Sequence, residues 1–167
     1  MTTPFYKRGT FDATTRSISA LAFIEKYCDK VDSLDLSGNF HDYYAPSCKF
    51  YNTNGVVYDG GAKIWTWMRG LFGSFDLCAH EHNSFRVVPA TAEEWDPAAG
   101  AQWVFIDTTT LFQFKSENGE AREVIKVPRF LMFLVGKSEV EGQGVQGLQI
   151  LEARIWWDTG LLGAKKG

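Results

Sequence analysis

Several features that mark large classes of protein are missing from this sequence. It has no cluster of lysine and arginine apart from Lys165 and Lys166, and its 17 basic and 20 acidic residues give a net charge of −3. A nucleic-acid-binding protein needs a basic face, so we expect no nucleic-acid partner. No stretch approaches the roughly 18 apolar residues of a membrane span, and the N-terminus lacks the apolar core of a secretion signal. We therefore expect a cytoplasmic protein without a membrane partner.

Cysteine is also scarce. The three cysteines, Cys28, Cys48 and Cys78, are odd in number and far apart, which fits neither a zinc motif nor a disulfide framework. We expect three buried free thiols, as in a protein of a reducing compartment.

The motifs of common cofactor enzymes are absent too. The sequence contains no glycine-rich phosphate loop, no dinucleotide-binding fingerprint and no Gly-x-Ser-x-Gly elbow. Phosphoryl transfer, hydride transfer and serine hydrolysis therefore lose their usual apparatus. Acid/base chemistry without a cofactor, or binding alone, remains.

Aromatic residues, by contrast, are abundant. The chain has 13 Phe, 6 Trp and 6 Tyr, which together make 15% of its residues. Rings in such number either fill a core or line a hollow for a flat, apolar ligand. A small, apolar organic substrate is the partner that this composition favours.

The order of hydrophobic patterns predicts an α+β protein, with N-terminal helices packed on a strongly curved antiparallel sheet that forms a cone-shaped cavity. Residues 1–14 are expected to be a flexible arm, and residues 15–167 a single cone-shaped α+β barrel domain. Pro128 is expected to interrupt one strand, and residues 117–120 to form a hairpin turn. We expect helices at about 15–34, 40–44 and 62–72, and strands at 48–52, 77–88, 102–115, 124–137 and 149–158.

Three segments carry a resemblance to a known family. They are the closing strand and its continuation, residues 152–162 (EARIWWDTGLL), the strand segment His80-Glu81-His82-Asn83, and the helical run that ends at residues 43–46 (YYAP). Over residues 15–163 the chain resembles the SnoaL-like branch of the nuclear transport factor 2-like superfamily. The resemblance implies the cone-shaped fold and a homodimer formed through the outer sheet face. It also implies one of several activities: cyclisation, isomerisation, dehydration, epoxide hydrolysis or plain binding.

The closing strand separates two kinds of side chain. Glu152, Arg154, Trp156 and Asp158 share one face, and the other face is wholly apolar. Alternation alone favours solvent or a dimer partner for the polar face. The resemblance implies the reverse, with this face lining the cavity. Asp158 is then the first candidate for general acid or base, with a pKa raised by an aromatic pocket, and Arg154 would polarise a substrate oxygen.

Two histidines and a second carboxylate complete the predicted catalytic set. His80 and His82 share a strand face, where either could move a proton or simply hydrogen-bond to the backbone. They could also bind a metal, but no third ligand is visible, so we expect none. Asp107 lies in an otherwise apolar strand. It could pair with Arg129 as a salt bridge, or join Arg154 in an Asp–Arg–Asp set similar to that of limonene epoxide hydrolase.

The remaining candidates would contact the substrate through rings and polar groups near the cavity. For any single aromatic residue, core filling is the alternative. The predicted substrate contacts are Tyr44, Tyr51, Tyr58, Trp67, Trp103, Phe105, Arg129, Glu152 and Trp156.

Together these features predict an acid/base enzyme without a cofactor. The resemblance implies a small polyketide- or terpenoid-like intermediate of secondary metabolism as substrate, and isomerisation, cyclisation or rearrangement as reaction. An epoxide hydrolase or dehydratase is the first alternative. A non-catalytic module for ligand binding or dimerisation is the second.

Overall fold

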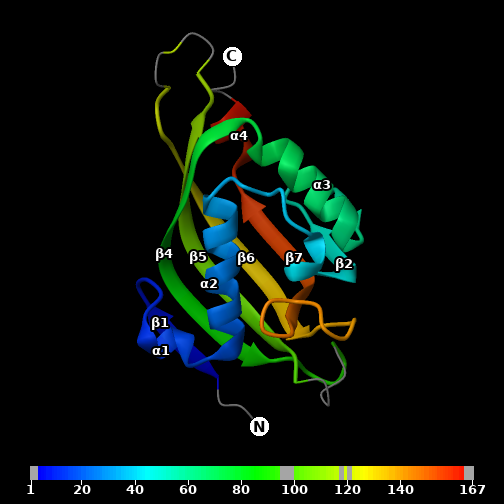
Figure 1. The fold of residues 1–167 in the computed structure, drawn as a ribbon. Coiled ribbons are helices and arrows are strands. Elements are labelled where there is room, and N and C mark those ends of the chain that lie inside the picture. The colour runs from blue at the N-terminus through cyan, green and yellow to red at the C-terminus, as the bar shows by residue number, and fades with distance from the viewer. Residues whose placement is uncertain (1–3, 95–99, 117–118, 120–121, 164–167) are drawn as a thin grey trace.

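The computed structural model describes residues 4–94, 100–116, 119 and 122–163. Seven strands form one sheet in the order β1-β4-β5-β6-β7-β2-β3 (Figure 1). The elements are β1 (Phe5–Arg8), α1 (Ala13–Arg16), α2 (Ser19–Asp32), η1 (Phe40–Asp42), β2 (Tyr44–Tyr51), β3 (Val57–Asp59), α3 (Gly61–Phe72), β4 (Phe75–Pro89), β5 (Gln102–Phe114), β6 (Ile125–Lys137), β7 (Leu148–Trp157) and α4 (Thr159–Gly163).

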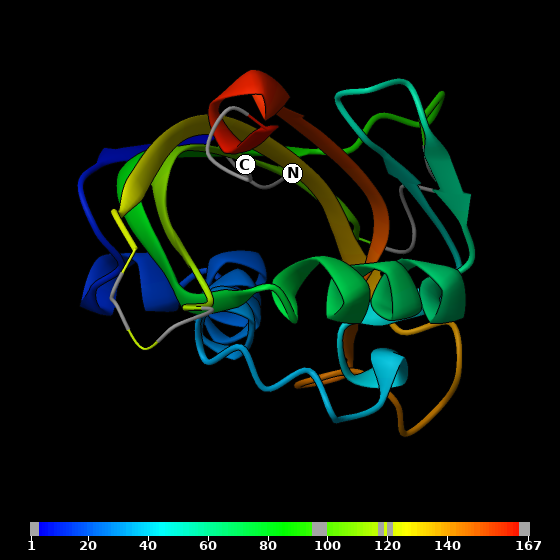
Figure 2. The ribbon, with the colours of Figure 1, turned by 90° about the horizontal axis from the view of Figure 1, so that it is seen from above.

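The sheet bends into an arch, and α2 and α3 lie beneath it (Figure 2). This arrangement confirms the predicted α+β class with helices packed on a strongly curved sheet. The sheet is open, with β1 and β3 at its two edges. It is also mixed rather than purely antiparallel, because β2 pairs parallel to β7.

Helix α2 forms because its apolar residues recur every three or four positions. Leu21, Ile24, Cys28 and Val31 are all buried, and they make the stripe that faces the sheet. The helix ends at Asp32, and Leu34 then adopts a positive φ of 56° that turns the chain away. Asp32 thus lies at the C-terminal end of the helix, beside the buried stripe.

Helix α3 packs closely on β2 at its first residue. A Cβ on Gly61 would lie 2.7 Å from the carbonyl oxygen of Ala45 and 2.7 Å from the ring of Phe40. Only glycine fits this contact without a shift of its neighbours. The close approach brings Trp65 and Met68 of α3 into the core.

Strand β6 shows which face of the sheet is covered. Val127, Leu131 and Phe133 are buried, whereas Phe130 is 42% exposed. Pro128 was predicted to interrupt the strand, but the strand continues through it. It pairs with Thr109 of β5, and the pairing with β7 begins only at the next residue. Pro128 therefore lies where β6 has a partner strand on one side alone, a position in which sheets tolerate proline.

The prediction of a flexible N-terminal arm is wrong for residues 5–14. Strand β1 pairs antiparallel with β4, from Phe5 opposite Val87 to Arg8 opposite Ser84. Asp12 then caps α1 by accepting hydrogen bonds from the backbone N–H groups of the next turn. The polar composition of this segment hid an edge strand whose partner lies about 80 residues away in the sequence.

The remaining differences concern short pieces. Strand β3 and helix α4 were not expected, because three and five residues are too few to show a period. The predicted hairpin turn at 117–120 lies outside the described residues except for Gly119. The three cysteines are buried and free, as expected. No helix in the described part of the chain has the length and apolar character to cross a membrane.

The two faces of β6 predict different effects of the same substitution. Phe133→Ala removes a ring with 0% exposure, and we expect it to lower the free energy of unfolding by about 3–5 kcal/mol. Phe130→Ala, on the outer face, should change it by less than about 0.5 kcal/mol. Urea unfolding of both variants measures the difference. Equal losses would contradict the described orientation of the strand.

Candidate active site

A cavity lies between the helices and the concave face of the sheet. It is narrow, with a volume of about 30 Å³, enough for one or two water molecules. Its wall is mainly aromatic and aliphatic, with few polar side chains. The lining residues are Tyr27, Cys28, Val31, Phe50, Asn52, Trp67, Met68, Leu71, Phe72, Phe75, His80, Phe112, Arg129, Leu131, Phe133, Ile155, Trp157 and Leu162.

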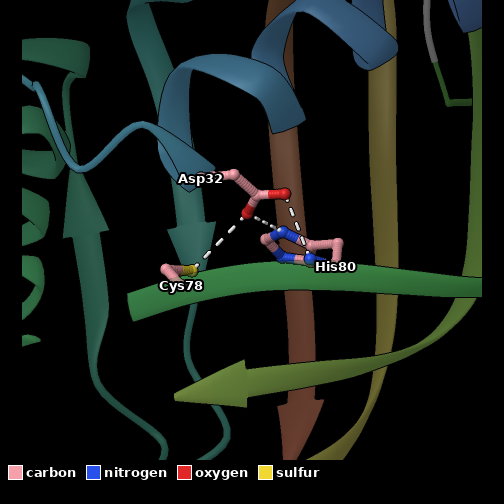
Figure 3. Close-up of side chains that lie close together, drawn as sticks. All are labelled: Asp32, Cys78 and His80. Carbon is pink, nitrogen blue, oxygen red and sulfur yellow. Dashed lines mark hydrogen bonds and ion pairs between the residues drawn. The ribbon is translucent and has the colours of Figure 1, made fainter. Parts of the chain in front are cut away.

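One polar group on this wall is His80, which is held by a carboxylate from the helix layer. Its ring Nδ1 lies 2.5 Å from Oδ1 of Asp32, and its backbone N–H donates to Oδ2 of Asp32 at 3.0 Å. Figure 3 shows Asp32 at the end of α2 above His80 and Cys78 on β4. The His80 side chain is only 4% exposed. Two bonds to one carboxylate therefore fix both the position and the ring orientation of this histidine.

The local sequence explains this meeting. Asp32 follows Cys28 by four residues, so it lies at the edge of the buried stripe of α2. Cys78 and His80 are two residues apart on β4 and share its concave face. The Cys78 thiol donates to Asp32 Oδ1 at 3.6 Å. Burial, and then the Asp32 carboxylate, raise the pKa of this thiol, so it stays protonated as a weak donor.

These three side chains could also offer ligands to a metal ion. One oxygen of Asp32, the sulfur of Cys78 and a ring nitrogen of His80 all lie within 4.8 Å of one another. An open three-ligand set of this kind suits zinc. The same three atoms, however, already satisfy one another through hydrogen bonds. The donors therefore fit a metal by type, while their bonding describes an acid/base pair with a supporting thiol.

The second charged group on the wall is Arg129. Its Nε is buried without a hydrogen-bond partner in the described part of the protein. Its Nη1 reaches the Thr110 hydroxyl at 3.5 Å, the limit of a hydrogen bond. The guanidinium lies over the rings of Phe112 and Trp157, with its Cζ 5.9 and 5.6 Å from the two ring centroids. Burial lowers the pKa of Arg129 from its ordinary value, although an arginine remains charged.

A pair of phenols lies deeper in the same wall. The hydroxyls of Tyr27 and Tyr44 are 2.6 Å apart, and the Tyr44 hydroxyl donates to the sulfur of Met68 at 3.3 Å. Burial raises the pKa of Tyr27, so its hydroxyl is neutral. Of the two, Tyr27 lines the cavity. Because the Tyr44 hydrogen goes to Met68, the Tyr27 hydroxyl donates its own hydrogen to Tyr44, and only its oxygen is left to accept a further hydrogen bond.

His82 lies behind His80 rather than on the cavity wall. The two rings are parallel within 8°, with centroids 5.9 Å apart. The rings of Phe11 and Phe85 also pack against His82, with centroids 4.8 and 5.3 Å from that of the His82 ring. Burial, and then the neighbouring His80, lower the pKa of His82 to about 4. His82 is therefore a neutral ring at physiological pH and a packing partner of His80.

Comparisons with known proteins identify the fold but show little sequence similarity. No family model matches the chain, and no curated protein matches it significantly. Among solved structures, a candidate SnoaL-like polyketide cyclase from Shewanella denitrificans OS-217 aligns with TM-score 0.58 at 11% identity, over 92% of this chain and 97% of that one. A candidate scytalone dehydratase from Novosphingobium aromaticivorans aligns with TM-score 0.60 at 13% identity, over 87% and 89%. The chain has the SnoaL-like, nuclear transport factor 2-like fold.

A further structure supports the assignment. A candidate dehydratase of the NTF2-like family from Streptomyces avermitilis aligns with TM-score 0.64 at 8% identity, over 85% of this chain and 95% of that one. Identities this low carry the SnoaL-like fold and no residue roles. The site must therefore be argued from this chain's own side chains.

On this SnoaL-like scaffold the predicted orientation of β7 is wrong. Ile155 and Trp157 line the cavity, so the opposite, polar face points outward. Glu152 and Arg154 pair with each other at 2.7 Å there, and Trp156 is 45% exposed. Asp158 is exposed, and its Oδ1 accepts the N–H of Gly160 at 2.8 Å at the start of α4. The apolar side chains went to the core, as alternation alone had favoured.

Asp107, predicted as a second catalytic carboxylate, also lies outside the cavity. It is exposed on the outer face of β5, whereas Arg129 points inward, so the two do not pair. The Asn83 side-chain amide donates to Oδ1 of Asp107 at 3.4 Å. Phe105 lines an outer groove with Asp107, and Trp103 lies 6.5 Å from Phe105 on the same strand face. All three therefore lie away from the cavity.

The predicted tyrosines also take positions outside the cavity wall. Tyr51 lies under the Arg154 guanidinium at 4.9 Å on the outer face. Tyr58 stacks behind Trp67 with centroids 4.5 Å apart, and Trp67 itself lines the cavity. Of the predicted site residues, the structure thus brings His80, Trp67 and Arg129 together on one wall.

Sequence reasoning missed Asp32, although a signal for it exists. A carboxylate in the last turn of a helix faces the negative end of the helix dipole, so its local effect is unfavourable. Placed beside a buried stripe, such a residue is a candidate for a tertiary role. Tyr27 carried no comparable signal, because a phenol in that stripe reads as core.

The outer face of the SnoaL-like sheet carries an open groove of about 500 Å³. Phe105, Phe130 and Arg86 are among its residues, and Phe130 packs on the exposed Trp156 at 5.7 Å. The homodimer expected through this face stays a prediction, which light scattering tests.

The low pKa of His82 predicts a loss of stability in mild acid. The unfolded chain takes up this proton near pH 6.5, and the folded chain only near pH 4. Between these values the unfolded state binds more protons, so stability falls as the pH drops. Between pH 7 and pH 5 we expect wild type to lose about 2 kcal/mol more than His82→Phe. Urea unfolding at both pH values measures this. Parallel losses in the two proteins would contradict it.

Proposed function

We propose that the protein is an acid/base enzyme that works without a cofactor on a small, flat, mostly apolar molecule in the cavity. The observation that carries the proposal is the bond between His80 and Asp32 at the cavity wall. An ionised carboxylate only accepts hydrogen bonds, so it holds the proton on Nδ1 of the histidine. The other nitrogen, Nε2, is then left with a free lone pair and can serve as a base.

The first step is removal of a proton from a carbon next to a substrate carbonyl. Nε2 of His80 takes the proton, and the electron pair of the C–H bond moves to the carbonyl oxygen as an enolate. Asp32 stabilises the imidazolium that results and keeps its ring oriented.

The negative charge on the enolate oxygen needs a partner in an apolar environment. The Arg129 guanidinium lies on the cavity wall and can supply it. Such preorganised donors are effective where water is excluded, because the surrounding medium screens them little.

The fate of the enolate decides the reaction. Return of the proton to another carbon gives isomerisation, and attack of the enolate carbon on a second carbonyl gives ring closure. A flat polyketide-type intermediate offers the adjacent carbonyls that either route needs. The aromatic walls, including Phe112 and Trp157, support a substrate of that shape.

Dehydration is the second candidate, and the same histidine supports it. If the enolate carries a hydroxyl on its β-carbon, that hydroxyl leaves as water with the proton from His80. Epoxide hydrolysis is less supported, because the predicted Asp–Arg–Asp set does not assemble. Isotope-labelled water appearing in the product would mark hydrolysis.

Entry of a substrate requires the cavity to open. About 30 Å³ is too little for an aromatic molecule, so side chains at the mouth must move. Leu162 of the short helix α4 lies buried at this wall with Leu71 and Phe75. Displacing a five-residue helix requires little free energy, because few other elements pack on it.

The dyad can be tested with 2-tetralone, a flat bicyclic ketone with acidic protons beside its carbonyl. We expect the wild type to catalyse exchange of these protons in heavy water. Asp32→Asn and His80→Gln should slow the exchange by about two to four orders of magnitude, because the base is lost or held in the wrong tautomer. Proton NMR of the ketone measures the rate.

Asp158→Asn is the matched control, because it changes another carboxylate near the end of the fold that lies outside the cavity. It should leave the rate within a few-fold of wild type. Circular dichroism verifies that each variant is folded. Exchange at the wild-type rate in both dyad variants would refute the assignment.

A metal mechanism and the proposed mechanism also differ in their response to a chelator. Because the ligand atoms of Asp32, Cys78 and His80 bond to one another, we expect dialysis against EDTA to leave the exchange rate unchanged. Loss of exchange, restored by added zinc, would show that the three act as metal ligands instead.

A further inference from the structure

Arg129 is the feature that the acid/base pair alone does not explain. Its position on β6 puts it on the concave face between Val127 and Leu131, both of which are buried apolar residues. The sequence thus interrupts an apolar stripe with a cation. An exposed lysine or arginine could have been placed on the opposite face without any cost of burial.

The guanidinium lacks a counter-ion in the described part of the protein. No carboxylate there lies within ion-pair distance of it, and no aspartate or glutamate lines the cavity. Asp32, which contacts the wall residue His80, already accepts bonds from His80 and Cys78. A buried charge without a partner is strongly unfavourable for folding. The protein therefore holds a cation whose Nε is buried without a partner among the described residues in a mainly apolar cavity.

The surroundings of Arg129 restrict what could satisfy it. The rings of Phe112 and Trp157 lie close to its guanidinium, so a ligand reaching it passes between aromatic surfaces. The Trp157 indole donates to the Asn52 side chain at 3.3 Å, which holds that ring in place. Nε and the terminal nitrogens of an arginine present parallel donors that match the two oxygens of a carboxylate.

We propose that the cavity binds an aromatic carboxylate, with the carboxylate on Arg129 and the ring between the aromatic walls. This names the substrate class of the proposed enzyme, and as a statement about substrate it rests on that function. Binding itself does not depend on the reaction. The anion cancels the buried charge, and the arginine anchors the molecule while His80 acts on another of its atoms.

The test compares benzoate with benzamide, which has nearly the same size and shape but no charge. By isothermal titration calorimetry we expect the wild type to bind benzoate at least about tenfold more tightly. Arg129→Met should reduce this preference to about one, and its melting temperature in the absence of ligand should equal or exceed that of wild type. Arg86→Gln, which removes an exposed arginine of the outer groove, should keep the full preference.

A second measurement uses only the wild type, in case Arg129→Met does not fold. The NMR signal of the Arg129 Nε–H should shift on addition of benzoate and stay in place with benzamide. Equal binding of the two compounds, binding of neither, a preference that survives in Arg129→Met, or an unmoved Nε–H signal would each overturn the proposal. Asp32→Asn should bind benzoate like wild type, so failure of the dyad and failure of the anion site are separable.

Discussion

The hydrogen bond between the side chains of Asp32 and His80 joins the helix layer to the sheet. Its partners are 48 residues apart in the sequence, one at the end of a helix and one in the middle of the longest strand. The carboxylate also accepts the backbone N–H of His80, so it is held by both the backbone and the imidazole of this residue. The pair therefore forms only when α2 lies on β4, and the packing of the fold sets the geometry of the two side chains.

The cavity wall carries three polar groups of different kinds. An oriented imidazole, a neutral phenol and a guanidinium whose Nε has no partner in the described part of the protein share mainly apolar walls. Low polarity strengthens every interaction between these groups and a ligand, and it makes each of them expensive when the ligand is absent. A sequence selected for stability alone would have placed a leucine or methionine at Arg129. This conflict between stability and Arg129 is the observation on which the proposed carboxylate site rests.

The sequence predicted most of the fold and a smaller part of the site. Long periodic segments such as residues 62–72 and 102–115 were predicted nearly to their ends, because burial imposes a strict period on a helix or strand. For β7 the apolar run of Leu151, Ala153 and Ile155 indicated the correct inner face, and the family resemblance indicated the wrong one. His80 was found by its residue type. Asp32 was missed because its partner lies on another element, and single-element patterns carry no information about such pairs.

The parallel pairing of β2 with β7 has a consequence for how the protein is made. Strand β2 leaves the ribosome about 100 residues before β7. Tyr51 can therefore pair with Arg154 in the parallel ladder only after β7 has been synthesised. Hairpins between β4, β5 and β6 close locally and early, whereas this contact spans most of the chain. Trp157 and Ile155 arrive with that final strand. The cavity therefore closes only after β7 has been made, and until then its aromatic walls are open to chaperones and to other chains.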